Sequence, residues 1–347
     1  MKRSIMRSAT PIHPHDLSDS DLALITALQQ TPRASWARIA RAIGVSAPTA
    51  RRRWEALAAA GAAWSSAYAV TAPGLVTGLV EIRCRPGTVD EVAAQLRTEP
   101  KFLSLTGMTG ERDLVVTIVA DDMEQFRRLI QSRVATHEAV TGVRSTIVTR
   151  MFSEGSRWRA VGSPETAGVG DAPGAAGLDD DAHSLAAQWR PVLRALESDG
   201  RVAPADIARE LGVSEAHARR VVRRVLERGW IKQRIDVSLE QTMWPHALAL
   251  WLVVPAGRLE ATASEIAVMP MTRMCAALAG GASNLYVIVW LRDLAEATAV
   301  EADLARSLEL RVLDRAILLH YYKRVGHLFD VRNRYEGRVS WVGDETG

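Results

Sequence analysis

The chain has 347 residues, of which 48% are hydrophobic and 24% are charged. This balance is typical of a folded protein with room for about two domains, and it excludes a fibrous or wholly disordered chain. The longest apolar runs, such as residues 247–255, are far shorter than the roughly 20 residues of a membrane-spanning helix. We therefore expect a cytoplasmic protein without a membrane partner. A formal net charge of +3 permits an anionic partner without requiring one.

Cysteine and histidine usage gives no sign of a metal site or a disulfide. The two cysteines, Cys84 and Cys275, lie far apart in apolar surroundings and belong to no Cys-x-x-Cys or Cys/His cluster. This pattern predicts buried free thiols. The eight histidines are scattered and form no His-Glu-x-x-His motif. We therefore expect no metal, no cofactor and no catalytic residues.

A duplication divides the chain into two halves. Residues 33–52 and 201–220 align without a gap at a constant offset of 168, and 11 of the 20 positions are identical. Residues 161–184, between the copies, are rich in Gly, Ala, Pro and Asp and lack an apolar period, as expected of a flexible linker. The predicted regions are an N-terminal arm (1–16), a helix-turn-helix domain (17–72), a mixed α/β domain (73–152), a linker (153–184), a second helix-turn-helix domain (185–240), a second mixed domain (241–325) and a C-terminal tail (326–347).

Each half begins with three predicted helices. In the first half, one helix starts near Ser18, the next covers about residues 35–43, and the third runs from Ser46 to Gly61. A tight glycine turn separates the last two helices, which is the spacing of a helix-turn-helix unit. The second half repeats this pattern up to Gly229. Weak alternation then predicts a short strand in each half, forming a wing or a connecting arm, over residues 63–71 and 231–237.

A mixed α/β pattern follows each helical unit. The order is strand, helix, strand, strand, helix, strand, over residues 75–83, 88–97, 102–108, 113–119, 123–134 and 143–151, and again over residues 247–254, 259–267, 272–278, 284–291, 294–307 and 312–322. This βαββαβ order predicts a ferredoxin-like antiparallel sheet with both helices on one face. Because the other face is bare, we expect the two modules to pair sheet to sheet. The predicted fold class is α+β, with two tandem copies of a helix-turn-helix and a ferredoxin-like module.

Two runs of residues carry a family resemblance. The first is residues 45–57 (VSAPTARRRWEAL), and the second includes Pro100, residues 110–113 (GERD) and residues 122–127. In this order, and repeated in the second half, they resemble the Lrp/AsnC (leucine-responsive, feast/famine) transcriptional regulators in a tandem double-length form. The resemblance implies a winged helix-turn-helix whose third helix enters the major groove of DNA. It also implies a ligand-sensing module, often called the RAM domain.

Arginines surround the start of the third predicted helix of the first half. From Arg33 to Arg53 there is no acidic residue, and the basic side chains lie beside a helix N-terminus that itself favours phosphate. We expect groove contacts from Ser46, Pro48, Thr49 and Arg52, which lie off the apolar stripe near the helix start, and a contact of Arg51 with the DNA backbone. The candidate DNA-binding residues of this copy are Ser46, Pro48, Thr49, Arg51, Arg52 and Arg53. The alternative stays open that the serine only caps the helix and the arginines form a solvated face.

The second copy departs from the family pattern. Val221 stands where the family keeps an arginine, and Glu215 adds a negative charge near the expected phosphate position. We hypothesise that the two heads read different half-sites, or that the second binds DNA more weakly. The candidate DNA-binding residues of this copy are Ser214, His217, Arg219, Arg220 and Arg223.

The family binds small effectors, often amino acids, near the glycine turn between the second and third strands of paired sensor modules. By position, the resemblance assigns the first effector site to Thr109, Gly110, Glu111 and Asp113, and the second to Gly280, Gly281 and Asn284. Glycine lets backbone amides approach a carboxylate, and an aspartate can hold an ammonium group. The asparagine of the second copy lacks that charge. In the alternative interpretation these residues only form hairpin turns.

The resemblance therefore implies a DNA-binding transcriptional regulator associated with the nucleoid. Its partners would be double-stranded DNA, a small effector such as an amino acid, and further copies of itself, with the two sensor modules pairing within one chain. An enzyme is the main alternative, because siroheme decarboxylases resemble this architecture. Their histidine- and arginine-rich substrate site has its nearest match in residues 320–324 (HYYKR). A non-DNA-binding oligomerisation partner of other regulators is a third possibility.

Overall fold

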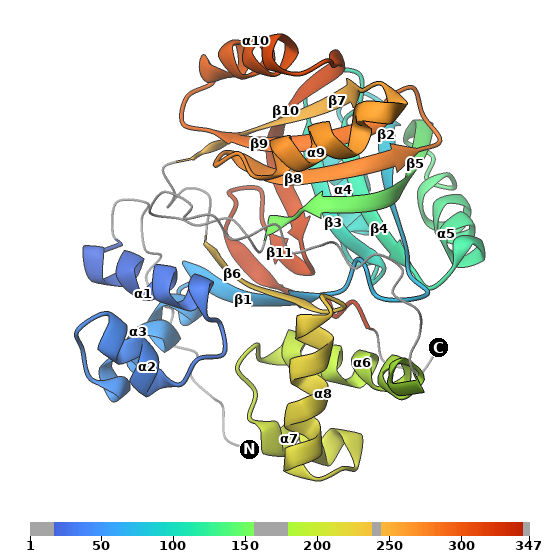
Figure 1. Ribbon diagram of the computed structural model, residues 1–347. Helices are drawn as coiled ribbons and strands as arrows, with labels where there is room; N and C mark the ends of the chain where they lie inside the picture. Colours follow the sequence, from blue (N-terminus) through green and yellow to red (C-terminus); the bar gives the residue numbers. More distant parts are fainter. Residues whose placement is uncertain (1–16, 156–179, 238–243, 343–347) are drawn as a thin grey trace, which may run out of the picture.

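The computed structural model describes residues 17–155, 180–237 and 244–342, and these form two helical heads on one side of a barrel (Figure 1). Serine caps start several of the helices: Ser18 forms a capping box with Asp21, and Ser46 accepts a hydrogen bond from the Thr49 amide. Head one contains α1 (Asp19–Gln30), α2 (Trp36–Ala42) and α3 (Ala47–Ala59), and head two contains α6 (Asp180–Ser198), α7 (Pro204–Leu211) and α8 (Glu215–Glu227).

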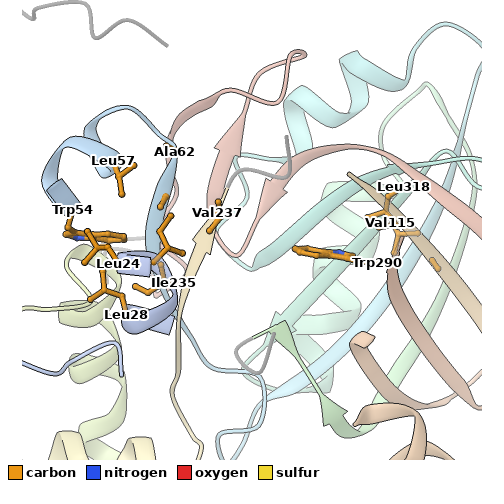
Figure 2. Packing of buried hydrophobic residues seen from close by; sticks show 14 of the residues in the cluster. Leu24, Leu28, Trp54, Leu57, Ala62, Val115, Ile235, Val237, Trp290 and Leu318 are labelled. Carbon is orange, nitrogen blue, oxygen red and sulfur yellow. The ribbon is translucent and has the colours of Figure 1, made fainter. Parts of the chain in front are cut away.

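The strand that follows each head forms a ribbon with its counterpart from the other half. β1 (Ala63–Tyr68) and β6 (Lys232–Val237) run antiparallel and make their own two-stranded sheet. The arm expected after each head is therefore a connection between the halves. Each strand also packs against the head of the opposite half. Figure 2 shows Ile235 of β6 beside Leu24 and Leu28 of head one, and Val237 of the same strand belongs to this buried cluster.

Two ferredoxin-like modules form the barrel, and their element order is the one expected. The first contains β2 (Val76–Cys84), α4 (Val89–Leu96), β3 (Phe102–Met108), β4 (Leu114–Ala120), α5 (Met123–Leu129), a π-helical turn (Ile130–Val134) and β5 (Val140–Ser153). The second contains β7 (His246–Val253), α9 (Leu259–Ala267), β8 (Thr272–Ala279), β9 (Leu285–Leu291), α10 (Glu296–Ser307) and β10 (Arg311–Arg324).

The two modules join edge to edge instead of stacking face to face. β5 pairs with β8, and β10 pairs with β3, so that eight strands close in the order β10-β3-β4-β2-β5-β8-β9-β7, with β7 pairing back to β10. The physical reason is that each isolated sheet would leave the amides and carbonyls of two edge strands unpaired. Closure gives those groups partners and also covers the bare faces.

Side chains fill the barrel, as an eight-stranded barrel allows. Figure 2 shows Val115, Trp290 and Leu318 together on the inside, and Trp251 and Tyr286 belong to the same buried cluster. Alternate residues of the same strands point outward, where each module packs its own helices in a separate core. Cys84 and Cys275 are buried free thiols, as predicted, and burial raises their pKa values to about 11 and about 12.

The region expected to be a C-terminal tail adds structure to both parts of the molecule. β11 (His327–Phe329) and β12 (Tyr335–Arg338) extend the sheet beyond β10, and Trp341 is buried against Trp189 of head two, with ring centroids 6.2 Å apart. Apolar contacts such as that of Trp341 hold this region in place. The sequence of the region has no apolar period, so these contacts could not be predicted from it. The expected arm (1–16) and most of the expected linker lie outside the described residues. No helix in the described part of the chain has the length and hydropathy to cross a bilayer.

Candidate DNA-binding and effector sites

Helix α3 presents most of the DNA-binding candidates of head one on its exposed face. Ser46 caps the helix and its hydroxyl lies 2.7 Å from that of Thr49, so both side chains are fixed at the helix start. Pro48 occupies the first turn and is exposed. Arg51 and Arg52 are also exposed, and Arg51 pairs with Glu55 at 2.8 Å. An exposed pair of this kind is weak and can open when a phosphate approaches.

Helix α8 of head two differs from α3 in having an acidic residue, Glu215, in its first turn. Ser214 caps the helix by accepting a hydrogen bond from the His217 amide, as Ser46 does in head one. Arg219 donates from Nε to Glu215 at 3.1 Å. Arg223 lies 3.9 Å from Glu227, and Arg220 is exposed. Two of the three arginine candidates in this helix therefore have a carboxylate beside them.

The change from arginine to valine between the heads has a structural explanation. Arg53 is only one-third exposed and pairs with Asp21 of α1 at 3.4 Å. At the same offset of 168, the second half has Val221 and Trp189, and both are buried in the core of head two. An ion pair between the first and third helices of head one is thus replaced by an apolar contact in head two. Arg53 therefore braces head one.

A reciprocal clasp, which the sequence analysis missed, holds the two heads together. Arg33 donates to the carbonyls of Gly200 and Val202 at 2.8 and 2.9 Å. Arg201, its counterpart in the repeat, donates to the carbonyls of Pro32 and Ala34. Burial lowers the pKa of both guanidiniums. The clasp relates the heads by a pseudo-twofold axis, and the identical arginines at the start of the repeat were the signal for it.

The first candidate effector turn lies at the seam between the modules. The amide of Thr109 donates to the carbonyl of Ile317 at 3.0 Å, and its hydroxyl accepts from the Ile317 amide at 2.8 Å. Gly110 has φ of 93°, a conformation that favours glycine. Asp113 accepts a hydrogen bond from the Cys84 amide at 2.7 Å, while Glu111 is exposed. These residues hold the turn and the seam, and one carboxylate oxygen of Asp113 is engaged in doing so.

The second candidate turn occupies the equivalent seam. Gly280 has φ of 100°, and a Cβ on Gly281 would lie 2.9 Å from a methyl carbon of Thr146 in β5. Asn284 accepts from the Val254 amide at 2.9 Å and donates to the Val254 carbonyl at 2.7 Å. Both functional groups of the asparagine are therefore bound to backbone, so this turn has a structural role.

Arg112 is a buried residue of the first turn. It belongs to the run at 110–113 but was not among the predicted effector-site residues. It pairs with Glu81 at 2.7 Å and with Asp314 of the second module, and its guanidinium lies 3.8 Å from the centre of the Trp251 ring. Next to it, Glu111 and Arg144 help to line a cavity of about 150 Å³. Asp314 and Trp251 are more than 100 residues away along the chain, so no local pattern could reveal these partners.

A buried charged cluster connects the ribbon to the barrel. Asp236 of β6 lies 2.7 Å from Arg234, 3.2 Å from Arg273 of β8 and 2.8 Å from Arg324 of β10, and it accepts a hydrogen bond from Ser66 of β1. Burial alone would raise the pKa of Asp236, but the three guanidiniums hold it well below its usual range. Movement of the ribbon against the barrel would separate these charges, so the cluster fixes the heads to the sensor modules.

Three models of known protein families match parts of the chain. The AsnC-type helix-turn-helix domain matches residues 17–58, the Lrp/AsnC ligand binding domain matches residues 77–158, and a winged helix-turn-helix DNA-binding domain matches residues 191–232. The protein is therefore of the class that joins helix-turn-helix heads to ligand-binding modules. The matched domains of the first half are those of the Lrp/AsnC regulators, and the helix-turn-helix unit occurs a second time along the chain.

Individual relatives resemble either one half or the whole architecture. The HTH-type transcriptional regulator Ptr1 of Methanocaldococcus jannaschii is 26% identical over 40% of this chain and 95% of its own. The transcriptional regulator AzlB of Bacillus subtilis is 28% identical over 38% of this chain and 88% of its own. The siroheme decarboxylase NirDL, in complex with an iron-uroporphyrin III analogue, is 15% identical with a TM-score of 0.56 over 94% of this chain and 95% of its own. That last likeness concerns the fold alone.

Proposed function

We propose that the protein is a transcriptional regulator that binds specific DNA sequences with its two heads and responds to a small effector in its paired sensor modules. The observation that carries this proposal is the clasp between Arg33 and Arg201, which holds two capped recognition helices in one pseudo-symmetric pair. Symmetric pairs of helix-turn-helix heads read half-sites whose spacing matches that of the heads. The relatives named as transcriptional regulators support the same function.

The effector is proposed to be an amino acid or a related metabolite that binds near the Thr109–Asp113 turn. The carboxylate of Asp113 and the adjacent cavity support this position. Because the turn touches β10 of the other module, an effector there would favour one arrangement of the two modules over another. It would change operator affinity by its difference in affinity for those arrangements.

The first experiment titrates the protein against DNA from upstream of its own gene, beside an unrelated fragment of equal length, at several salt concentrations. We expect selective binding whose logarithmic affinity falls steeply with the logarithm of salt concentration, because arginine–phosphate contacts release counterions. Equal and weak binding of both fragments at every salt concentration would contradict the proposal.

A pair of matched double variants tests whether the two heads contribute equally. We expect Arg51→Ala with Arg52→Ala to weaken operator binding at least tenfold more than Arg219→Ala with Arg220→Ala, since Glu215 places a negative charge in the first turn of α8, where α3 has none. The measurement is a fluorescence anisotropy titration at fixed salt. Equal losses from the two double variants would mean that the heads are equivalent.

A second candidate function is that of an enzyme similar to siroheme decarboxylases, and the whole-chain likeness in fold favours considering it. Against it, the run at 320–324 is used for structure. Lys323 and Arg324 are buried and bound to Glu99 and Asp236, and burial lowers the pKa of His320. A haem-like absorbance in the purified protein, or binding of an iron porphyrin that removes the DNA affinity, would favour the enzyme.

A further inference from the structure

A groove between the two heads has the size of a small-molecule site. Its volume is about 460 Å³, within the range of roughly 300–1,000 Å³ that ligand cavities occupy. The walls come from the turn between α1 and α2, the first turn of α2, the end of α8 and the start of β6. The residues used below are Pro32, Arg33, Arg38, Leu226, Ile231 and Lys232.

Cationic side chains line this groove without a carboxylate among them. The guanidinium of Arg33 is occupied by the clasp between the heads. Arg38 is exposed and Lys232 is half-buried. Within the described part of the chain, neither of these two has an acidic group at ion-pair distance. Two positive charges, one from head one and one from the ribbon strand that follows head two, therefore face the same space.

The pseudo-symmetric counterpart of the groove has the opposite character. At the offset of 168, Asp199 replaces Thr31, Asp206 replaces Arg38, and Trp64 replaces Lys232. Asp206 is paired with its neighbour Arg209 at 3.0 Å. The architecture alone would give two equal grooves, so the cationic one owes its charge to side chains that differ between the halves.

We propose that this groove binds a phosphate group between Arg38 and Lys232. A phosphate monoester carries up to two negative charges near neutral pH and can accept hydrogen bonds from both cations at once. The apolar side chains of Pro32, Leu226 and Ile231 give an attached organic group a surface to pack on. An occupant touches both heads, so its binding and operator binding affect each other reciprocally.

The phosphate can come from two sources, and the test separates them. One is a free phosphate monoester, and the other is the DNA backbone between the two half-sites. The DNA source rests on the proposed function, whereas the free source does not.

The variants that test both sources are Arg38→Gln, Lys232→Gln and the double variant. The control is Arg306→Gln, which removes an exposed arginine on α10. This helix lies on the barrel, away from the two heads and the groove between them (Figure 1).

Calorimetric titration tests the free source with inorganic phosphate, adenosine 5′-monophosphate and unphosphorylated adenosine. The expected result is that the phosphorylated probes bind, adenosine does not, and each groove variant weakens binding at least tenfold while Arg306→Gln does not. Operator titration at several salt concentrations tests the DNA source. There each groove variant is expected to reduce the slope of log affinity against log salt by about 0.9, the value for one lost phosphate contact.

The proposal is overturned if neither phosphorylated probe binds and the groove variants keep the salt slope of the wild type. Unchanged thermal unfolding of the variants would establish that a loss is not due to misfolding. If the wild-type protein binds no DNA at all, the proposed function fails, and the calorimetric titration alone decides whether the groove binds phosphate.

Discussion

Asp113 is the residue that separates the two interpretations of the first sensor turn. Its carboxylate accepts a hydrogen bond from the Cys84 amide, and an asparagine can accept the same bond without the charge. If the carboxylate holds an ammonium group, Asp113→Asn weakens the binding of an amino-acid effector at least tenfold, since a charged hydrogen bond is worth roughly 1.5–3 kcal/mol. The measurement is the effector-induced shift in thermal unfolding. An unchanged effector response would leave Asp113 with the structural role alone.

Lys323 gives the protein a pH dependence that one substitution can isolate. The residue is fully buried, its ammonium donates to the Glu99 carbonyl at 2.7 Å, and burial lowers its pKa from 10.5 to about 7. Between pH 7 and pH 10 the unfolded lysine keeps a proton that the folded one has lost. Stability therefore rises with pH in this window, by up to about 1.4 kcal/mol per pH unit from this group. Below pH 7 both states are protonated, so this group adds no further pH dependence.

Lys323→Met is expected to remove that rise. Urea unfolding at pH 7, 8 and 9 measures the difference in stability between the wild type and the variant, so that other titrating groups cancel. Lys232→Met, which removes a half-buried lysine at the heads, is the control. Parallel stability curves for the wild type and Lys323→Met would show that the buried lysine does not titrate in this range.

Among single residues, those with local partners could be predicted and those with distant partners could not. The cap at Ser46 follows from the serine at the start of an apolar helical period. Arg112 and Asp236 look like surface charges in the sequence. Each is buried by partners from other strands, and such pairings follow from the tertiary fold.

At the scale of elements, the ribbon and the turns between the first and second helices decide how the heads are presented. β1 packs on head two and β6 packs on head one, and Gln29 of α1 donates to the Ile235 carbonyl at 3.1 Å. The heads therefore depend on each other's strands, in addition to the clasp. A sequence pattern predicts a strand after each head, but it does not state which strand will pair with it.

Arg201→Gln tests whether the clasp sets the spacing of the heads. The variant loses the hydrogen bonds to the Pro32 and Ala34 carbonyls and the contact of the guanidinium with Trp36, at 4.1 Å from the ring centre. We expect the affinity for a complete two-half-site operator to fall about tenfold, while the affinity for an isolated half-site stays within a factor of about two, because each recognition helix is intact. Anisotropy titrations of both DNA lengths make the comparison. Equal losses on the two lengths would locate the defect in the heads themselves.

At the scale of the whole molecule, closure of the barrel makes one unit of two halves. The seams β5–β8 and β10–β3 each join strands of different modules, and the interior cluster contains side chains of both. Separated halves would expose two edge strands and an apolar face each.

Expression of the halves as separate chains tests this account. Residues 17–155 alone are expected to self-associate, and mixing them with residues 180–347 is expected to give a stable one-to-one complex. Size-exclusion chromatography with light scattering measures the masses. A first half that remains a stable monomer at high concentration would contradict the account, since its edges and inner face would then need no cover.

By itself, the sequence determined the elements of this protein and their duplication. Capping serines, glycine turns and the βαββαβ order are local signals, and the repeat at a constant offset of 168 places them twice. Only the tertiary structure decided that the modules close edge to edge, that β1 and β6 form a bridge, that Trp341 packs on head two, and that a cationic groove lies between the heads. The physical reason is that strand edges, buried charges and apolar faces are satisfied by partners from other parts of the chain. A local pattern records the need for such a partner but not its identity.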